Sequence, residues 1–369
     1  MTEPTTKLSA DIFNNLLEKE NFMADTITKR LRMRQGDSAT AKANNEVLRL
    51  GEFFYETDTG EIKIGDGVTK YNSLLGLQSE AKIAQKIAQG IYEGVNLQEK
   101  FAAEIAKYGN VADWLHARAA TNNFAGIYPG DYFYDSMSAG TVAGNAIAAK
   151  NKKIYIAGID LYYGTGDTEM PHHFTCFSLA DENVTWNDTN NNNGSAYSSH
   201  PWIASKLYAV LNGVNNASSN PVGACGYNAA GAGYYQLFSS KLRSRMVEQR
   251  VHMGMRYSAT AALNDDNGQA WVGRGLIFAP SEIEAYGGMI HSVKSTFPQC
   301  ENYGPWCQWP LFKSAGYRGR LLFGRVFWWL CSVSGGASAV AGVVAGDGVS
   351  GTNITSDTWV RAPLCFHIA

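Results

Sequence analysis

Hydrophobic and polar positions divide this chain into three stretches with different periods. Apolar and polar residues alternate between Ile27 and Arg34, which is the period of a half-buried strand. From Ser79 to Lys107 apolar residues recur every three or four positions, as in an amphipathic helix. After Tyr108, short aromatic or β-branched runs alternate with turn-rich stretches. The pattern predicts a β-rich α+β protein with a β-module (residues 1–78), a helical neck (79–108) and a large C-terminal domain (109–369).

The N-terminal module begins with a basic strand. Ile27, Leu31 and Met33 alternate with polar residues, several of them arginines, which therefore share one face. That face either contacts nucleic acid or an acidic partner, or is a solvated face of the sheet. A short helix is expected from Asp37 to Val47.

Residues 51–75 have the pattern of a β-hairpin. A strand at Glu52–Glu56 leads into a turn where Gly60 supplies the positive φ that a tight turn requires. A second strand follows at Glu61–Ile64, and Gly65-Asp66-Gly67 reverses the chain again.

The helical segment has an apolar stripe that runs from Ile83 to Ile105. Gly90 and Gly94 interrupt it, so the pattern predicts one amphipathic helix or two shorter ones. A strict heptad is absent, which argues against a long coiled coil. The segment is either a short trimeric neck or a helix that packs on its own domain.

The large domain should contain strands wherever aromatic and β-branched residues cluster. These runs are Gly126–Tyr134, Lys153–Leu161, Leu276–Ala279, Leu321–Val333, Ala339–Val344 and Trp359–Ile368. Phe327–Leu330 has no polar residue, which predicts a central strand buried on both faces. Helices are expected at Ser205–Leu211, after a start signal ending in Pro201, and after Ser281 as N-cap.

The stretch from Ser332 to Asp357 contains no Lys, Arg or Glu and is rich in small residues. Asp347-Gly348 predicts a two-residue hairpin turn between Ala339–Val344 and Val349–Ile354. So small and uncharged a stretch either displays interchangeable side chains on a rigid scaffold or is a plain edge hairpin.

Composition narrows the classes of function. The 369 residues carry a net charge of −2, so no strongly basic surface indicates nucleic-acid binding. The N-terminus lacks the pattern of a Sec signal, so export by that route is not expected. The longest apolar run, Leu321–Val333, is interrupted by Arg325, so membrane insertion is not expected either. Six cysteines without a Cys-x-x-Cys pair indicate mostly buried free thiols.

Candidate chemistry is sparse. His172 and His173 are adjacent, so on a strand they face opposite sides and cannot chelate one ion together. The paired acids Asp265-Asp266 and Glu282/Glu284 belong to a predicted turn and a helix start, not to a groove. No serine-hydrolase elbow, His-Glu-x-x-His or Walker loop occurs, and neither an enzyme activity nor a cofactor is expected.

The N-terminal hairpin resembles the amino-terminal module of bacteriophage tail fibres and tropism determinants. It shares Glu-Thr-Asp-Thr-Gly at residues 56–60, Gly-Asp-Gly at 65–67 and Tyr-Asn-Ser-Leu at 71–74. The large domain resembles the C-type-lectin-like heads of the same proteins. It shares Gly-Ile-Tyr-Pro-Gly-Asp-Tyr at 126–132, Gln-Trp-Pro-Leu-Phe at 308–312 and Phe-Trp-Trp-Leu at 327–330. Cys331 replaces a basic residue of the family, and Ala362-Pro363 inverts its usual order.

Trp186-Asn187-Asp188 spells a motif of calcium-binding animal lectins, but it lies mid-domain without their accompanying triplets. Formylglycine-generating enzymes share the lectin-like fold and use a cysteine pair. Cys331 and Cys365 could be compared with that pair, but the motifs around them do not match those enzymes. Sugar binding through calcium and thiol catalysis are therefore not favoured.

The resemblance implies a receptor-binding protein of the virion tail tip or baseplate, made in the host cytoplasm. Residues 1–78 would bind other tail proteins, and the head would bind a glycan or protein receptor on the bacterial surface. In relatives the segment before the last strand forms the receptor contact. Here the corresponding candidates are Val333, Ser334, Ser338, Val340, Val343, Asp347, Thr352, Asn353, Thr355 and Trp359. The alternative is a structural tail component whose head only stabilises the assembly.

The neck and the three-fold symmetry usual for tail fibres predict a homotrimer. Light scattering of the intact protein should give three times the mass of one 40.2 kDa chain. A monomer mass would show that the helical segment serves only its own domain.

Overall fold

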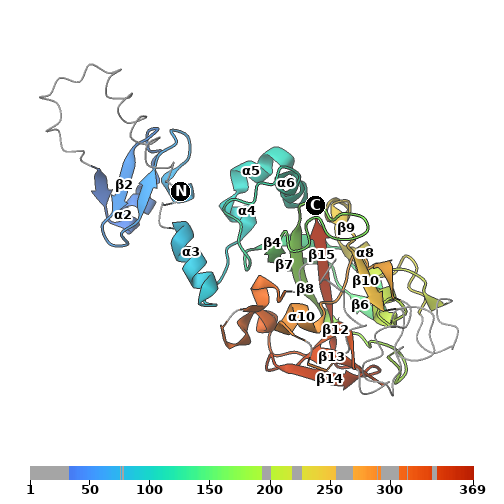
Figure 1. Cartoon of the computed structure of the whole chain (residues 1–369). Coiled ribbons are helices and arrows are strands. Elements are labelled where there is room, and N and C mark those ends of the chain that lie inside the picture. Colours follow the sequence, from blue (N-terminus) through green and yellow to red (C-terminus); the bar gives the residue numbers. More distant parts are fainter. Residues whose placement is uncertain are drawn as a thin grey trace, which may run out of the picture. The chain divides into compact units, whose positions relative to one another are not determined.

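The computed structural model describes residues 33–74, 76, 79–192, 201–217, 227–254, 269–288, 290–291, 307–313, 315–334 and 339–369. The chain divides into two compact units, an N-terminal unit ending at Lys82 and a large unit beginning at Ile83 (Figure 1). The fold is mixed α+β, with 25% helix and 30% strand, which confirms the predicted class. Most of the predicted basic strand Ile27–Arg34 lies outside the described residues.

The N-terminal unit is a three-stranded sheet with one helix. Its elements are β1 (Arg34–Gly36), α2 (Ser38–Asn44), β2 (Phe53–Glu56), β3 (Ile62–Ile64) and the 3-10 turn η2 (Tyr71–Ser73). β2 and β3 pair antiparallel, which confirms the predicted hairpin, and β1 adds to β2 in parallel. Gly60 has φ +73°, as its place in the turn requires. Asp58 accepts hydrogen bonds from the Ser38 amide (2.8 Å) and hydroxyl (2.7 Å), and so joins the hairpin turn to α2.

The helical segment breaks where its glycines predicted. α3 (Ser79–Ala88) is followed by Gly90 and Gly94, both with positive φ, and then by α4 (Leu97–Lys100) and α5 (Ala102–Tyr108). A Cβ on Gly94 would lie 1.8 Å from the Gly130 carbonyl oxygen, so only glycine fits there. Leu97 is fully buried in the core of the large unit. The segment 79–108 is therefore not a separate neck over its whole length, because its C-terminal half packs on the large unit.

Asp131 holds the connection between α3 and α4 in place. Its carboxylate is fully buried and accepts hydrogen bonds from the Tyr92 hydroxyl (2.5 Å), the Val95 amide (2.9 Å) and the Tyr128 amide (2.9 Å). Burial raises the pKa of Asp131 above its ordinary value, even though these donors favour the charged form.

One mixed sheet organises the large unit. Its order is β14-β13-β12-β15-β8-β7-β4, with β9 beside β15; β12 and β15 run parallel, and the other neighbours pair antiparallel. The strands are β4 (Tyr132–Met137), β7 (Lys150–Ile159), β8 (Phe174–Asn183), β9 (Met246–Val247), β12 (Trp328–Val333), β13 (Val340–Val344), β14 (Ser350–Ile354) and β15 (Arg361–Ile368). Two small hairpins stand apart, β5 (Gly140–Val142) with β6 (Asn145–Ile147) and β10 (Arg250–Gly254) with β11 (Gln269–Gly273).

Short helices connect these strands. They are α6 (Val111–Ala120), α7 (Lys206–Asn212), α8 (Tyr234–Leu237), α9 (Ser240–Arg243), α10 (Glu282–Tyr286), η5 (Pro310–Lys313) and η6 (Ala315–Leu321). Ser281 is the N-cap of α10, as predicted, and the structure also shows a capping box between Ser281 and Glu284. The helix predicted at Ser205–Leu211 is confirmed as α7, with Ser205 as its N-cap. None of the helices that the structure describes has the length and apolarity needed to cross a bilayer.

Packing confirms a buried central strand, but two of the predicted strand runs differ from the structure. All six residues of β12 are buried, in line with a strand that lies between β13 and β15 and is covered on both faces. The predicted run Leu321–Val333 is a strand only from Trp328 onward. Leu276–Ala279 is not a strand and makes a single bridge, between Phe278 and Cys365.

A buried ion pair joins four segments of the large unit. The Arg274 guanidinium, fully buried after β11, donates to both carboxylate oxygens of Glu284 on α10, one bond measuring 2.6 Å. The same carboxylate accepts the Tyr162 hydroxyl and the Ser281 amide (2.6 Å). The Trp309 indole donates to the Tyr162 oxygen at 2.7 Å.

These contacts determine the charge state of Glu284. Burial alone would raise its pKa, but the Arg274 charge and the four donors lower the pKa below the ordinary value, so the carboxylate stays ionised. A bidentate arginine suits this role because its fork matches both oxygens at once.

Removing the carboxylate should destabilise the large unit strongly. Glu284→Ala leaves the Arg274 charge buried without its partner, and we expect a loss of about 3–5 kcal/mol in the free energy of unfolding measured with urea. Asp167→Ala is the matched control, since it breaks the exposed Arg250–Asp167 pair and should not shift the midpoint measurably. Equal midpoints for the two variants would contradict this role of Glu284.

Candidate functional site

The terminal hairpin, β13 and β14 with the loop between them, lies at one edge of the large sheet (Figure 1). The Ala345 amide donates to Val349 O (2.9 Å), and the Gly348 amide donates to Ala345 O (2.8 Å). The loop therefore has three residues, Gly346-Asp347-Gly348, with φ +84° at Gly348. The predicted two-residue turn is wrong. The loop is a three-residue hairpin connection, and its last residue has to adopt the left-handed backbone conformation.

Two side chains from outside the hairpin hold its loop end. The Tyr286 hydroxyl donates to Val349 O (2.8 Å), and Arg320 Nε donates to Gly348 O (2.8 Å). The buried Arg320 guanidinium lies 4.8 Å from the centre of the Tyr286 ring and also donates to Ala285 O (2.9 Å). The hairpin is therefore supported by α10 and η6. Sequence reasoning missed both residues, because no local pattern relates them to a hairpin dozens of residues away.

The predicted contact residues fall into four groups: exposed, half-buried, outside the described residues, and buried. Asp347, Thr352 and Trp359 are exposed, while Val340 and Asn353 are half-buried. Ser338 lies outside the described residues. Val333, Ser334, Val343 and Thr355 are buried, so their prediction as contact residues is wrong in this structure. Val343 and Val333 face the core because the sheet is covered on both sides near β12.

Side chains of β14 alternate between the two faces of the sheet, and one exposed residue on this strand, Ile354, was missed by the sequence analysis. Ser350, Thr352 and Ile354 share one face of the strand, and Ile354 is 42% exposed. Trp359, 47% exposed, packs edge-on against Phe327 with ring centres 4.6 Å apart. The accessible surface of the hairpin is therefore β14, its loop and Trp359, and the interior strand β13 contributes little.

Trp186-Asn187-Asp188 has a structural role. Trp186 is fully buried, and its indole donates to Leu330 O (3.2 Å). Asn187 accepts the Lys206 amide (2.9 Å) at the start of α7, and Asp188 pairs with the Lys206 ammonium. Within the described part of the chain, no group of three His, Cys, Asp or Glu side chains is placed to hold a metal ion.

The two histidines pack against aromatic side chains, and His172 also hydrogen-bonds to a carboxylate. His172 stacks on Tyr163 with ring centres 3.8 Å apart and pairs with Asp160 (2.6 Å). His173 packs beside Tyr162 and His367 in the interior.

The described cysteines near the hairpin are not disposed to act as nucleophiles. Burial raises the pKa of Cys331 to about 12 and that of Cys365 well above its ordinary value, so both remain thiols at neutral pH. Cys176 is buried in the same way, and Cys307 is half-buried and unbridged. Cys225, Cys300 and the acids Asp265-Asp266 lie outside the described residues. Glu282 accepts the backbone amides of Ile290 and His291 (3.1 Å each).

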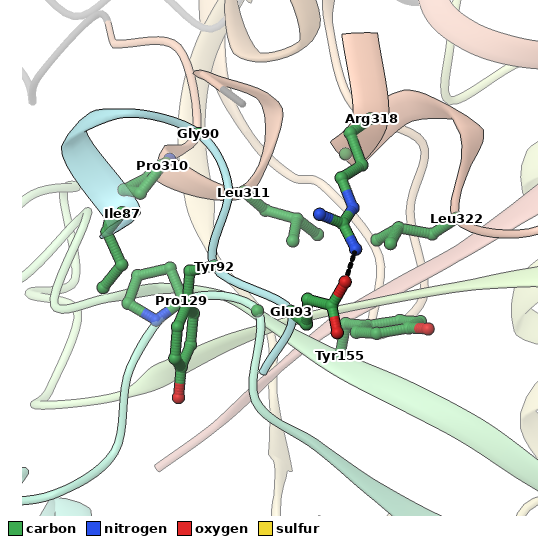
Figure 2. Close-up of a pocket in the computed structure, with 12 residues that line it drawn as sticks. Ile87, Gly90, Tyr92, Glu93, Pro129, Tyr155, Pro310, Leu311, Arg318 and Leu322 are labelled. Carbon is green, nitrogen blue, oxygen red and sulfur yellow. Dashed lines mark hydrogen bonds and ion pairs between the residues drawn. The ribbon is translucent and has the colours of Figure 1, made fainter. Parts of the chain in front are cut away.

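A pocket of about 250 Å³ lies where the residues after α3 meet η5 and η6. Figure 2 shows Glu93 and Arg318 paired across it at 2.7 Å, with Tyr92 and Tyr155 nearby. The two charges neutralise each other, and the remaining lining is mainly apolar. Because the Glu93 and Arg318 side chains are largely exposed, we expect this pair to contribute little to stability.

Comparisons of this chain with protein-family models, with curated proteins and with solved structures find no match.

Two lysine substitutions test which hairpin positions are on the surface. Val343→Lys puts a charge into the core and should cost about 3 kcal/mol or more in the free energy of unfolding. Thr352→Lys, in the neighbouring strand, should change it by less than about 0.5 kcal/mol. Thermal unfolding followed by circular dichroism separates them, and similar losses would contradict the burial described for β13.

Proposed function

We propose that this chain is a bacteriophage tail receptor-binding protein, whose C-type-lectin-like head attaches the virion to the bacterial surface. The motifs at residues 56–60, 65–67, 126–132 and 327–330 support the proposal, since they resemble both modules of such proteins in chain order. Residues 1–78 bind the rest of the tail, and the assembled protein is a homotrimer.

The exposed side of the terminal hairpin carries the proposal. Thr352, Ile354 and Trp359 lie on its surface. The side chains of Tyr286 and Arg320 hydrogen-bond to its backbone. The supporting bonds go to backbone carbonyls of the loop end, so side chains on β14 can change without disturbing them. A rigid backbone with replaceable side chains is suited to recognition.

Trp359 is the strongest single candidate for binding energy. It is large, rigid and half-exposed, and its position is set by Phe327. Aromatic residues of this kind concentrate affinity because few rotatable bonds are immobilised on binding.

Cell binding tests the proposal. Labelled full-length protein is titrated on intact cells of a panel of bacterial strains, together with Trp359→Ala and Thr352→Lys. On a strain that the wild type binds, each variant should weaken attachment by about tenfold or more, because an aromatic contact is lost or a charge is desolvated. Thr141→Lys, an exposed position on β5, is the matched control and should bind as the wild type does.

Two results would contradict the proposal in different ways. Normal attachment by both folded hairpin variants would place the contact surface elsewhere on the head. Failure of the wild type to bind any strain, with the protein present in purified tails, would favour the alternative of a structural tail or baseplate component.

A further inference from the structure

The hydrogen-bond register of the terminal hairpin determines which backbone groups of β14 face outward. The Ala345 amide donates to Val349 O and the Thr355 amide donates to Ala339 O, so the odd-numbered residues 349–355 face β13. In an antiparallel pair the residues between them point their N–H and C=O groups the other way. The outward groups on β14 are therefore those of Ser350, Thr352 and Ile354.

These outward groups form an open edge. β14 is the last strand in the sheet order, and no described residue pairs with the N–H groups of Ser350, Thr352 and Ile354 or with the carbonyls of Ser350 and Thr352. The Ile354 carbonyl accepts the Asp357 amide in a turn (2.9 Å). Outward donors and acceptors thus repeat every second residue, about 7 Å apart, which is the repeat of an extended peptide.

The opposite edge of the same sheet is covered over part of its length. There the Gln98 side chain binds the backbone of β4 as another strand would, accepting the Tyr134 amide (2.8 Å) and donating to Tyr134 O (3.2 Å). The Tyr132 amide donates to Val95 O (3.0 Å). Among the described residues, backbone groups of Tyr132 and Tyr134 at this edge are therefore paired within the protein, whereas the outward N–H groups of Ser350, Thr352 and Ile354 at the other edge are not.

The open edge also lacks the usual protection against strand pairing. Exposed edge strands commonly carry lysine, proline or a bulge that prevents addition of another strand. Residues 349–356 contain no charged residue and no proline, and β13 and β14 pair in continuous register. Thr352 and Ile354, on one face of β14, offer contacts for alternate side chains of an added strand.

We propose that β14 binds its partner by strand addition, so that the receptor contributes an extended peptide segment that becomes the next strand of the sheet. This inference rests on the proposed function and deepens it, because it assigns the receptor to proteins and not to glycans. Main-chain hydrogen bonds supply the affinity, and Thr352, Ile354 and the nearby Trp359 select the sequence.

One backbone substitution tests the inference. Thr352→Pro removes an outward N–H and puts the proline ring in the path of an added strand, while the ladder to β13 does not use that N–H. Thr352→Ala is the matched control, since it keeps the N–H and loses the side chain. Full-length proteins are titrated on cells of the strain that the wild type binds. We expect Thr352→Pro to weaken binding about tenfold or more and Thr352→Ala by less than about threefold, with unfolding temperatures close to that of the wild type.

Treatment of the same cells provides an independent measurement. Binding should be lost after proteinase K treatment and retained after periodate oxidation, which destroys sugar rings. The opposite result would identify a glycan receptor and overturn strand addition, while the proposed function would stand.

Other outcomes are equally decisive. Normal binding by Thr352→Pro, or equal losses for Thr352→Pro and Thr352→Ala, would overturn strand addition without affecting the proposed function. A larger wild-type oligomer that Thr352→Pro lacks would show that a second copy of the chain occupies the edge, and would also overturn the inference. If Thr352→Pro is unfolded, the pair Ser350→Pro and Ser350→Ala gives the same test at the neighbouring outward N–H.

Discussion

The packing of the large unit depends on the buried carboxylate of Glu284. It is buried together with the Arg274 charge, and either group alone would be costly in the interior. Because Tyr162 and Ser281 also donate to it, the segment of Tyr162, the residue after β11 and the start of α10 must meet before the carboxylate is satisfied. A buried polar cluster of this kind tolerates few alternative arrangements, and so it favours one position for α10 over others.

The position of α10 in turn determines the surface at the far edge of the sheet. Ser332 on β12 accepts the Glu282 amide (3.0 Å), and the Cys331 amide donates to Pro280 O (2.9 Å), so α10 is joined to the strand beside the terminal hairpin. Tyr286, at the end of α10, then reaches the hairpin loop. A charge pair in the interior thereby supports a hairpin whose outer strand, β14, is the last strand of the sheet among the described residues.

Local sequence signals predicted elements well where one short segment decides the structure. Gly60 marked a backbone position with positive φ, Gly94 marked a break in the helical segment and Ser281 marked a helix start, because each requirement involves only neighbouring residues. The burial of individual hairpin residues could not be read in this way. Ser332–Asp357 is so uniform in size and polarity that Val343 and Thr352 look equivalent in sequence, although one is buried and the other exposed.

The sequence by itself determined the α+β class, the N-terminal hairpin, the break after α3 and a central strand buried on both faces, since these follow from periodicity, glycine and local composition. Only the tertiary structure decided that Leu97 belongs to the core of the large unit and that Arg320 lies beneath the hairpin loop. It also decided which edge of the sheet is partly covered by Gln98 and which ends, among the described residues, at β14. These features depend on contacts between residues far apart in the chain, and such contacts leave no periodic pattern in a single sequence.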